Sequence, residues 1–413
     1  MKQVDYLIIG GGAAGTTAAE TIRTNDPKGS IIIVTEEPEP LYSRVLLPLY
    51  LEGQIPLEKL YLRTNQQYQE KLINLIKNVK ANKVGTQNRK VLLSDGQEIS
   101  YKKLLIASGG KAKHLDVPGS NLLGVTYLRT LTDANEIKDL VGKAQSAVVI
   151  GGWFVGLDFA RIFRKANLAT TCVTRGSGFG SRQVGENIGK LINLILEKNG
   201  VKLITQDQVR EFVGKNQLEK VILESDQEIA AEIAGIGVGI ALNTDYLDGS
   251  GIKINEGVVT NEYLETDTRD IWAAGDIAEF YDVIFGKQYK MGNWSNAVMQ
   301  GKIAGQNMVA GWGGKGREQF MAVSAYIMPF FEANLSLIGD TSTDEKIEII
   351  ELGSVADGRM GRFYLRDGII VGAALINLPA DRVPIEELIK KRVKIRDNKN
   401  KLADPKFDLN SLL

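Results

Sequence analysis

The same local pattern occurs twice in this chain, about 140 residues apart. The segment "DYLIIGGGAAGTTAAETI" starts at Asp5, and "AVVIGGWFVGLDFARIF" starts at Ala147. Each copy reads as an apolar strand, a glycine turn and a helix with small residues, and each leads to a second strand ("SIIIVTEE" and "LATTCVTR"). Two such βαβ units predict parallel sheets flanked by helices, which is an α/β fold.

The first copy carries a complete dinucleotide-binding pattern. Gly10, Gly12 and Gly15 form G-x-G-x-x-G directly after the strand, with Ala14 in the same turn. Gly10 permits the tight turn, Gly12 lets the backbone approach a pyrophosphate, and Gly15 lets the helix pack closely on the strand. Glu36 ends the next strand, 21 residues after Gly15, where a carboxylate can accept the ribose hydroxyls. Together these features predict a dinucleotide site.

Further segments extend this pattern along nearly the whole chain. They are "LLIASGG" at 104–110, "GIGVGIALNTDYL" at 235–247, "IWAAGDIAEF" at 271–280 and the helix "NWSNAVMQGKIAGQNMVAG". With these segments the chain resembles the FAD-dependent pyridine nucleotide-disulfide oxidoreductase family. The segment "LYSRVLLPLYLEG" at 41–53 is similar to that of rubredoxin reductases, ferredoxin reductases and nitrite reductase flavin domains.

The resemblance implies a set of FAD-binding residues. It brings Asp276 to the ribityl chain, Arg44 to a phosphate or ring oxygen, and the helix that starts near Trp294 over the pyrimidine edge. The full set implied for FAD is Gly10, Gly12, Ala14, Gly15, Glu36, Arg44, Ala107, Ser108, Gly109, Asp276, Trp294 and Ala297.

The resemblance also implies the domain organisation. Two Rossmann-like dinucleotide-binding domains are expected, the second inserted in the first, followed by a small α+β C-terminal domain. The FAD-binding domain is expected at 1–112 and 245–318, an NAD(P)H-binding-like domain at 113–244, and the C-terminal domain at 319–413.

The second copy departs from the family pattern at its middle glycine. It reads Gly151, Trp153, Gly156, and an added Cβ and indole at the middle position hinder the approach of a phosphate to the backbone. Asp158 stands where the family usually has glutamate, and Leu242 where "P-N" is usual. Three interpretations stay open. The indole moves aside and NAD(P)H binds, the indole fills the pyrophosphate groove, or the groove binds another ligand.

If a nicotinamide dinucleotide does bind, the same copy indicates which residues meet it. Arg175 ends the second strand, 19 residues after Gly156, and an arginine there favours the 2′-phosphate of NADPH. The candidate residues for NAD(P)H are Gly151, Gly152, Val155, Gly156, Asp158, Arg175 and Gly239.

Thiol chemistry is excluded by the residues that are missing. Cys172 is the only cysteine and lies in an apolar strand, so neither a C-x4-C pair nor a disulfide can form. Val45 stands where the single-cysteine peroxidases of the family have their cysteine, and Leu49 where its reductases often have lysine. His114, the only histidine, lies in a polar loop. A bound cofactor is therefore expected to carry the chemistry.

Charge and hydropathy narrow the partners. Lys plus Arg number 50 and Asp plus Glu 50, so no net field attracts nucleic acid. No apolar run approaches the ~20 residues of a membrane span, and we expect a cytoplasmic protein. The sequence predicts an FAD-dependent oxidoreductase that moves electrons between NAD(P)H or another reduced donor and a small redox protein. The alternative is a flavin-binding subunit or scaffold of a redox complex that does not use NAD(P)H. A homodimer is expected by analogy only.

Overall fold

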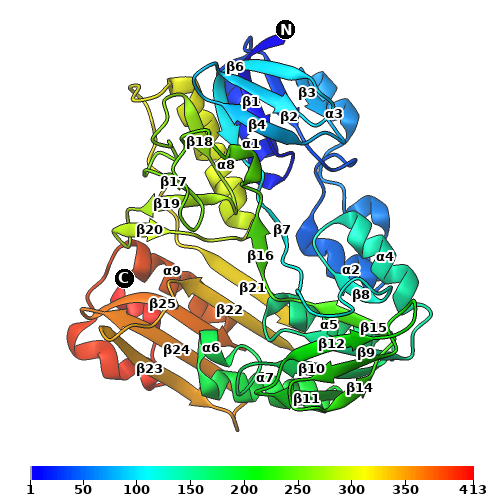
Figure 1. Ribbon diagram of the computed structural model, residues 1–413. Helices are drawn as coiled ribbons and strands as arrows, with labels where there is room; N and C mark the ends of the chain where they lie inside the picture. The colour runs from blue at the N-terminus through cyan, green and yellow to red at the C-terminus, as the bar shows by residue number, and fades with distance from the viewer. Residues whose placement is uncertain (1) are drawn as a thin grey trace. The chain divides into compact units, whose positions relative to one another are not determined.

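The computed structural model describes residues 2–413 of the chain, which form two compact units (Figure 1). The first unit consists of Met1–Val45, Leu57–Lys111 and Ala241–Ser324. The second consists of Leu46–Pro56, Ala112–Ile240 and Ala325–Leu413. Each unit contains one of the two βαβ repeats.

A seven-stranded sheet forms the centre of the first unit, in the order β3-β2-β1-β6-β5-β4, with β18 also paired to β6. The strands around β1 are parallel, whereas β4 and β5 are antiparallel additions. All four residues of β2 are buried, as expected for a strand covered on both faces. The bounds are β1 Lys2–Ile9, β2 Ile31–Val34, β3 Ile73–Ile76, β4 Ala81–Gly85, β5 Lys90–Leu93, β6 Glu98–Ile106 and β18 Ile271–Ala273.

Two helices of the first unit, α1 (Ala13–Asn25) and α8 (Trp294–Ala310), lie side by side (Figure 1). A Cβ added to Gly301 of α8 would lie 2.3 Å from the carbonyl oxygen of Ala14 on α1. Because that distance is far below a normal carbon–oxygen contact, the helices can approach this closely only with glycine at this position.

The second unit contains a five-stranded parallel sheet in the order β11-β10-β9-β15-β8. Helix α4 begins with a capping box, in which Thr130 and Asp133 each bond the other's backbone N–H. The bounds are β8 Val125–Tyr127, β9 Ser146–Ile150, β10 Ala169–Thr174, β11 Val201–Thr205, β15 Ile233–Ile236, α4 Leu131–Val141, α5 Phe154–Lys165 and α7 Glu186–Lys198.

A second five-stranded sheet of the same unit is antiparallel, in the order β21-β22-β25-β24-β23, and α9 packs on β25 and β22. These strands and this helix give the end of the chain the α+β character that the resemblance implies. The bounds are β21 Ala325–Phe330, β22 Ala333–Gly339, β23 Ile347–Ser354, β24 Arg359–Arg366, β25 Ile369–Ile376 and α9 Arg382–Lys390.

The remaining helices and strands are short. They are α2 Leu47–Leu51, α3 Asn65–Glu70, α6 Ser181–Val184, β7 Gly110–Ala112, β12 Val209–Val213, β13 Lys220–Leu223, β14 Glu228–Ala230, β16 Ile240–Leu242, β17 Val258–Thr260, β19 Ala278–Asp282 and β20 Lys287–Tyr289. The predicted α/β class is confirmed by the parallel strands around β1 and by the parallel sheet of the second unit. The predicted boundaries of the three domains stay predictions. No helix within residues 2–413 is long and apolar enough to cross a membrane.

Candidate functional site

The first glycine turn joins β1 to α1, and its outer glycines are required by the backbone. Gly10 has φ +115°, and a Cβ added there would lie 2.2 Å from the carbonyl oxygen of Ala107. A Cβ added to Gly15 would lie 1.9 Å from the carbonyl oxygen of Gly10. Any larger residue at either position would therefore distort the turn, as the glycine pattern implies.

Gly12 is the N-cap residue of α1, and the space around it is open. No heavy atom of the described chain lies within 4 Å of the position that its Cβ would take, and no side chain caps this helix end. The N–H groups of the first helical turn lack intrahelical acceptors, and the helix dipole favours negative charge there. The turn thus offers space and donors that fit the pyrophosphate of FAD.

The turn after β6 forms a second wall of this site. Ala107 supplies the carbonyl that keeps side chains out of the glycine turn, and Gly109 has φ +58°. The Ser108 hydroxyl donates to the carbonyl oxygen of Asn243 at 3.1 Å and lies 2.9 Å from the Tyr246 hydroxyl. These bonds hold the predicted segment against the chain after β16; Asn243 and Tyr246 lie in the segment 235–247 that carries the resemblance, but neither was singled out as a site residue.

Asp276 lies in a turn after β18 that contacts both α1 and α8. A Cβ added to the preceding Gly275, which has φ +85°, would lie 3.1 Å from the Ala14 Cβ and 3.7 Å from the Ala297 Cβ. The Gly275 N–H donates to the Gln300 side-chain oxygen at 2.7 Å. Three predicted residues from distant parts of the sequence therefore meet at the start of α1.

Helix α8 carries two more polar or aromatic groups at this end of the unit. Trp294 is its first residue, and the side chain of the preceding Asn293 accepts a hydrogen bond from the N–H of Asn296. Gln300 is fully buried, and its side-chain nitrogen has no hydrogen-bond partner among the described residues. An unpartnered donor beside the turn is a further feature that fits a bound polar group there.

The predicted acid and arginine of the FAD site differ in their surroundings. Glu36 is exposed, two residues beyond β2. Its neighbour Glu37 pairs with Arg44 and also accepts a hydrogen bond from the Tyr42 hydroxyl. Burial lowers the pKa of Arg44, but the negative charges of Glu37 and Asp276 are among the causes that raise it overall. Arg44 and Asp276 are thus electrostatically coupled; their roles and that of Glu36 toward FAD stay predictions.

The second glycine turn, between β9 and α5, repeats the outer geometry of the first. Gly151 has φ +116°, and a Cβ added there would lie 2.2 Å from the carbonyl oxygen of Gly237. A Cβ added to Gly156 would lie 2.3 Å from the carbonyl oxygen of Gly151. A Cβ on Gly152 would lie 3.1 Å from the Cβ of Thr174. The backbone of a dinucleotide-binding turn is therefore present in this unit too.

Trp153 is the N-cap residue of α5, in an extended conformation with φ −140° and ψ −167°. The six-membered part of its indole lies over Gly180, where an added Cβ would be 2.7 Å from Cζ3. The Trp153 and Phe154 rings are 4.4 Å apart, and Phe154 stacks on Tyr326 at 4.0 Å. The indole thus lies between the start of α5 and the loop that follows β10.

Asp158 belongs to a partly buried cluster of charges in the second unit. Its carboxylate lies 3.4 Å from the Arg161 guanidinium, which also pairs with Glu52 and donates to the carbonyl oxygen of Pro329 at 2.6 Å. The Glu52 side chain is only 1% exposed. Burial raises the pKa of Asp158 to about 7; the charge of Glu52 adds to this rise and Arg161 opposes it.

The other residues predicted for NAD(P)H lie near strand ends of the same sheet. Arg175 is exposed and follows β10 directly. Gly239, which has φ +106°, follows β15, and its carbonyl oxygen accepts a hydrogen bond from the N–H of Lys113. Val155 lies in the first turn of α5 and is 37% exposed. Because the carboxyl ends of parallel strands share one edge, these residues frame the edge that carries the second turn.

The single thiol and the single imidazole are held in structural positions. Cys172 is fully buried in β10, and burial raises the pKa of its thiol well above the usual range. Such a thiol is not an available nucleophile or redox group. The His114 ring stacks on Tyr127, with ring centroids 4.1 Å apart. Among the side chains that the structure describes, no group of three or more His, Cys, Asp or Glu is arranged to hold a metal.

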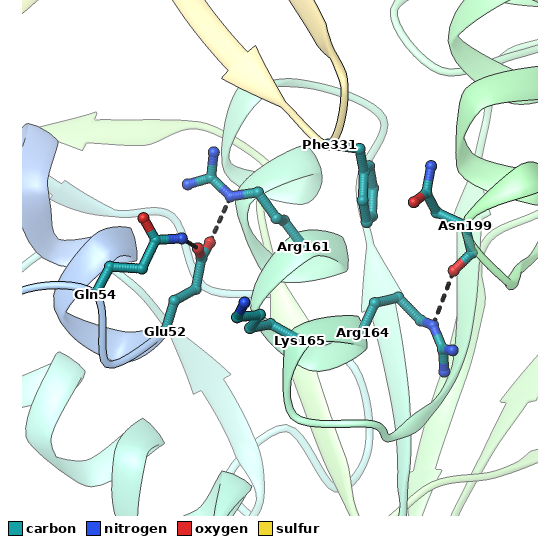
Figure 2. A pocket seen from close by; sticks show the side chains of 7 residues that line it. All are labelled: Glu52, Gln54, Arg161, Arg164, Lys165, Asn199 and Phe331. Atoms are coloured by element: carbon teal, nitrogen blue, oxygen red, sulfur yellow. Dashed lines mark hydrogen bonds and ion pairs between the residues drawn. The ribbon is translucent and has the colours of Figure 1, made fainter.

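Figure 2 shows a cavity of about 330 Å³ in the second unit, beside the C-terminal half of α5. Arg161 on one side pairs with Glu52, and Arg164 on the other donates to the carbonyl oxygen of Asn199 at 3.0 Å. Phe331, at φ +46° in the turn between β21 and β22, lies between them. The lining residues are Glu52, Gln54, Arg161, Arg164, Lys165, Asn199 and Phe331. None of them was predicted from the sequence. Both guanidinium groups already bond residues of other segments of the chain.

Comparison with known proteins agrees with this geometry. A family model described as pyridine nucleotide-disulphide oxidoreductase matches residues 4–301, and a reductase C-terminal model matches residues 330–413. The chain belongs to the pyridine nucleotide-disulphide oxidoreductase family, which confirms the resemblance seen in the sequence. The family uses FAD and NAD(P)H, and its class is that of FAD-dependent oxidoreductases.

This chain covers different shares of the length of individual relatives. Nitrite reductase [NAD(P)H] of Bacillus subtilis is 27% identical over 398 residues, which are 96% of this chain but only 48% of that protein. Putidaredoxin reductase of Pseudomonas putida is 26% identical over 402 residues, covering 95% of this chain and 93% of the relative. The chain thus spans about half of the first protein and nearly all of the second.

Two solved structures have the same fold over their full length. The putidaredoxin reductase of a covalent complex with putidaredoxin has a TM-score of 0.91 at 25% identity, covering 100% of this chain and 98% of that one. A ferredoxin reductase from Rhodopseudomonas palustris has a TM-score of 0.89 at 25% identity, covering 98% and 99%. Both resemble this chain in all its parts, including the antiparallel sheet at its end.

Proposed function

We propose that this chain is an FAD-dependent oxidoreductase that passes electrons from NAD(P)H or another reduced donor to a small redox protein. The observation that carries the proposal is the first glycine turn, in which Gly12 leaves open space at an uncapped helix start. The chain around it supplies Asp276 and the wall formed by Ala107, Ser108 and Gly109.

FAD, when bound, can take up electrons as a hydride pair and release them singly. The residues of this chain bind and orient it. The N–H groups at the start of α1 and the open Gly12 would accommodate the pyrophosphate, and Glu36 would accept the ribose hydroxyls. Asp276 and Arg44 would hold the ribityl and ring end, together with Trp294 and Ala297 on α8. Cys172 takes no part, because its thiol is buried and stays protonated.

A small redox protein is the proposed acceptor, because two reductases with this fold are named for such partners. Either an independent reductase or a subunit of a larger complex is consistent with the lengths of the relatives. A homodimer and a cytoplasmic location are part of the same proposal. The first is measured by light scattering on the purified holoprotein, and the second by cell fractionation.

The experiment that tests the proposal starts from purified protein. Bound flavin should be visible by absorbance and identified as FAD after release. The protein is then reduced anaerobically with dithionite and mixed with ferredoxin or rubredoxin, and reoxidation of the flavin is followed by stopped flow. Reoxidation by these proteins that is faster than by buffer alone supports the proposal. Protein that neither contains nor takes up FAD, or that ignores every such acceptor, contradicts it.

The second candidate is a flavin-binding subunit of a redox complex that does not use NAD(P)H. Trp153 in place of the middle glycine is the observation that favours it. NADH and NADPH are added anaerobically in separate experiments. Bleaching of the flavin within seconds supports the reductase, whereas bleaching by dithionite alone supports the subunit.

A further inference from the structure

The second unit has the backbone of a dinucleotide site but a different surface over it. In a βαβ site the pyrophosphate lies at the helix N-terminus and the adenosine ribose at the end of the next strand. In this unit those places are the start of α5 at Phe154 and the end of β10 at Thr174. A dinucleotide must therefore cross the space between the turn and the loop after β10.

The Trp153 side chain and the loop after β10 occupy that space. The Trp153 indole extends from the turn onto Gly180 of the loop, where its Cζ3 lies 2.7 Å from the position of an added Cβ. The N–H of Gly180 donates to the carbonyl oxygen of Gly152 at 2.7 Å, so the backbone of the loop is bonded to the turn itself. The indole and this bond together close the path from the helix start to the end of the strand.

The loop that contains Gly180 is also held in place by contacts with α5 and α7. Phe179 is fully buried, and its Cζ lies 3.2 Å from the position of an added Cβ on Gly156. The N–H of Phe179 donates to the Asn193 side-chain oxygen at 2.9 Å. A Cβ on Gly178 would lie 2.9 Å from the Asn193 side chain. The loop is therefore packed against α5 and α7 rather than held only at its ends.

We propose that Trp153 is a specificity-determining residue, whose indole occupies the place of the pyrophosphate and gives the second unit a low affinity for NADH and NADPH. The inference rests on the proposed function only in treating this unit as the dinucleotide half of a flavin reductase. It adds that the second glycine turn does not select the electron donor of this chain.

The test is a series of substitutions measured on the FAD-containing protein. NAD+ and NADP+ are titrated by calorimetry into the wild type and into Trp153→Phe, Trp153→Ala and Trp153→Gly, because the oxidised nucleotides bind through the same pyrophosphate without turnover. Trp153→Phe keeps an aromatic ring over Gly180 and serves as the matched control. Flavin content and the unfolding temperature of each variant establish that it is folded.

Trp153→Gly should bind both nucleotides at least about tenfold more tightly than the wild type, as expected when one or two charge-assisted N–H bonds to phosphate are gained. Trp153→Ala should gain less because it keeps a Cβ, and Trp153→Phe should gain little. If the glycine variant does not fold, the alanine variant decides by exceeding the phenylalanine variant. Equal affinities across the folded variants, or micromolar binding by the wild type, overturn the inference. These results leave the transfer of electrons from dithionite-reduced flavin to a redox protein untouched, so the two proposals fail separately.

Discussion

The two glycine turns of this chain have nearly the same backbone constraints at their outer glycines and differ at the middle glycine of the pattern. In both, the first glycine has φ near +115° and faces a carbonyl oxygen at 2.2 Å from an added Cβ. In both, the last glycine faces the carbonyl of the first. The middle position is Gly12 in open space in the first turn, and Trp153 over Gly180 in the second. The outer glycines thus build the turn, while the middle residue decides what can approach it.

The largest effect should come from making the first turn resemble the second. Gly12→Trp places an indole where the pyrophosphate of FAD would lie, and removes about two charge-assisted bonds worth about 1.5–3 kcal/mol each. FAD retention should fall by more than about a hundredfold. The affinity is measured by titrating FAD into the flavin-free protein. Gly12→Ala is the graded control, because its φ of −75° suits any residue and its Cβ meets no atom of the described chain. Full retention of FAD by Gly12→Trp would contradict the assignment of this turn.

The outer glycines allow the two turns to be broken separately. Gly10→Ala and Gly151→Ala should each cost about 1–3 kcal/mol from backbone strain, with a further cost from the carbonyl contact. Gly10→Ala should also lose FAD, whereas Gly151→Ala should keep it. Thermal unfolding and flavin absorbance of both variants are compared. Equal loss of FAD in the two would mean that the turns are not independent in function.

Substitution of Asp276 tests whether this residue contributes to FAD binding near the first turn. Asp276→Ala should weaken FAD binding by about 1.5–3 kcal/mol if the carboxylate bonds the ribityl chain. Asp276→Asn keeps part of the hydrogen bonding and should lose less. The FAD remaining after extensive dialysis is measured by absorbance. Full occupancy in the alanine variant would show that Asp276 does not contact the cofactor.

A smaller effect, on how the free energy of unfolding depends on pH, is expected from the helix that follows each turn. Seven residues after the first glycine, α1 has Thr17 and α5 has Asp158. The pKa of Asp158 is raised from 3.8 to about 7, so the folded chain binds this proton more tightly than the unfolded chain. The contribution of Asp158 to the free energy of unfolding should therefore fall as pH rises from about 4 to about 7 and level off above that.

Urea unfolding at several pH values, on the wild type and on Asp158→Asn, measures this dependence. The variant cannot titrate at this position and should have a flatter profile across that range. Thr17→Val is the matched change in α1 and should leave the profile of the wild type unchanged. A profile that is the same for the wild type and Asp158→Asn would place the pH dependence elsewhere.

The smallest effect on function concerns the strand after the second turn. Cys172→Ser should leave FAD binding and any reductase rate within a factor of a few, because the buried thiol is not activated. The added hydroxyl has a cost of its own, since burying it without a partner destabilises the fold by about 1–3 kcal/mol. Flavin content, rate and unfolding temperature are measured together. Loss of turnover in a folded, FAD-containing variant would assign chemistry to the thiol.

Much of the fold was predictable because its signals are local. Apolar runs before and after the two glycine turns predicted the parallel strands, and the resemblance implied an α+β arrangement at the end of the chain, where the antiparallel sheet and α9 lie. Among the FAD residues, Ala14, Ala297 and Asp276 were predicted from separate motifs and do lie together around Gly275. Their contact with the cofactor stays a prediction, as does the contact of every NAD(P)H candidate.

Other parts of the sites could not be predicted, because they join residues far apart in the sequence. Glu37 rather than Glu36 pairs with Arg44, although both acids follow the same strand. Glu52 and Arg161 are more than a hundred residues apart and meet beside Asp158. No spacing rule connects such pairs; only the packing of α2 against α5 brings them together.

The sequence by itself determined the two βαβ units, the glycines that their turns require and the lack of a redox-active cysteine pair. These follow from backbone dihedral angles, hydrophobic period and residue type, all of which act over a few neighbours. Only the tertiary structure decided where the Trp153 side chain lies. Its position over Gly180 depends on a loop that Phe179 and Asn193 fix against two helices. The direction of a side chain is set by what packs around it, and that is known only when the whole unit has folded.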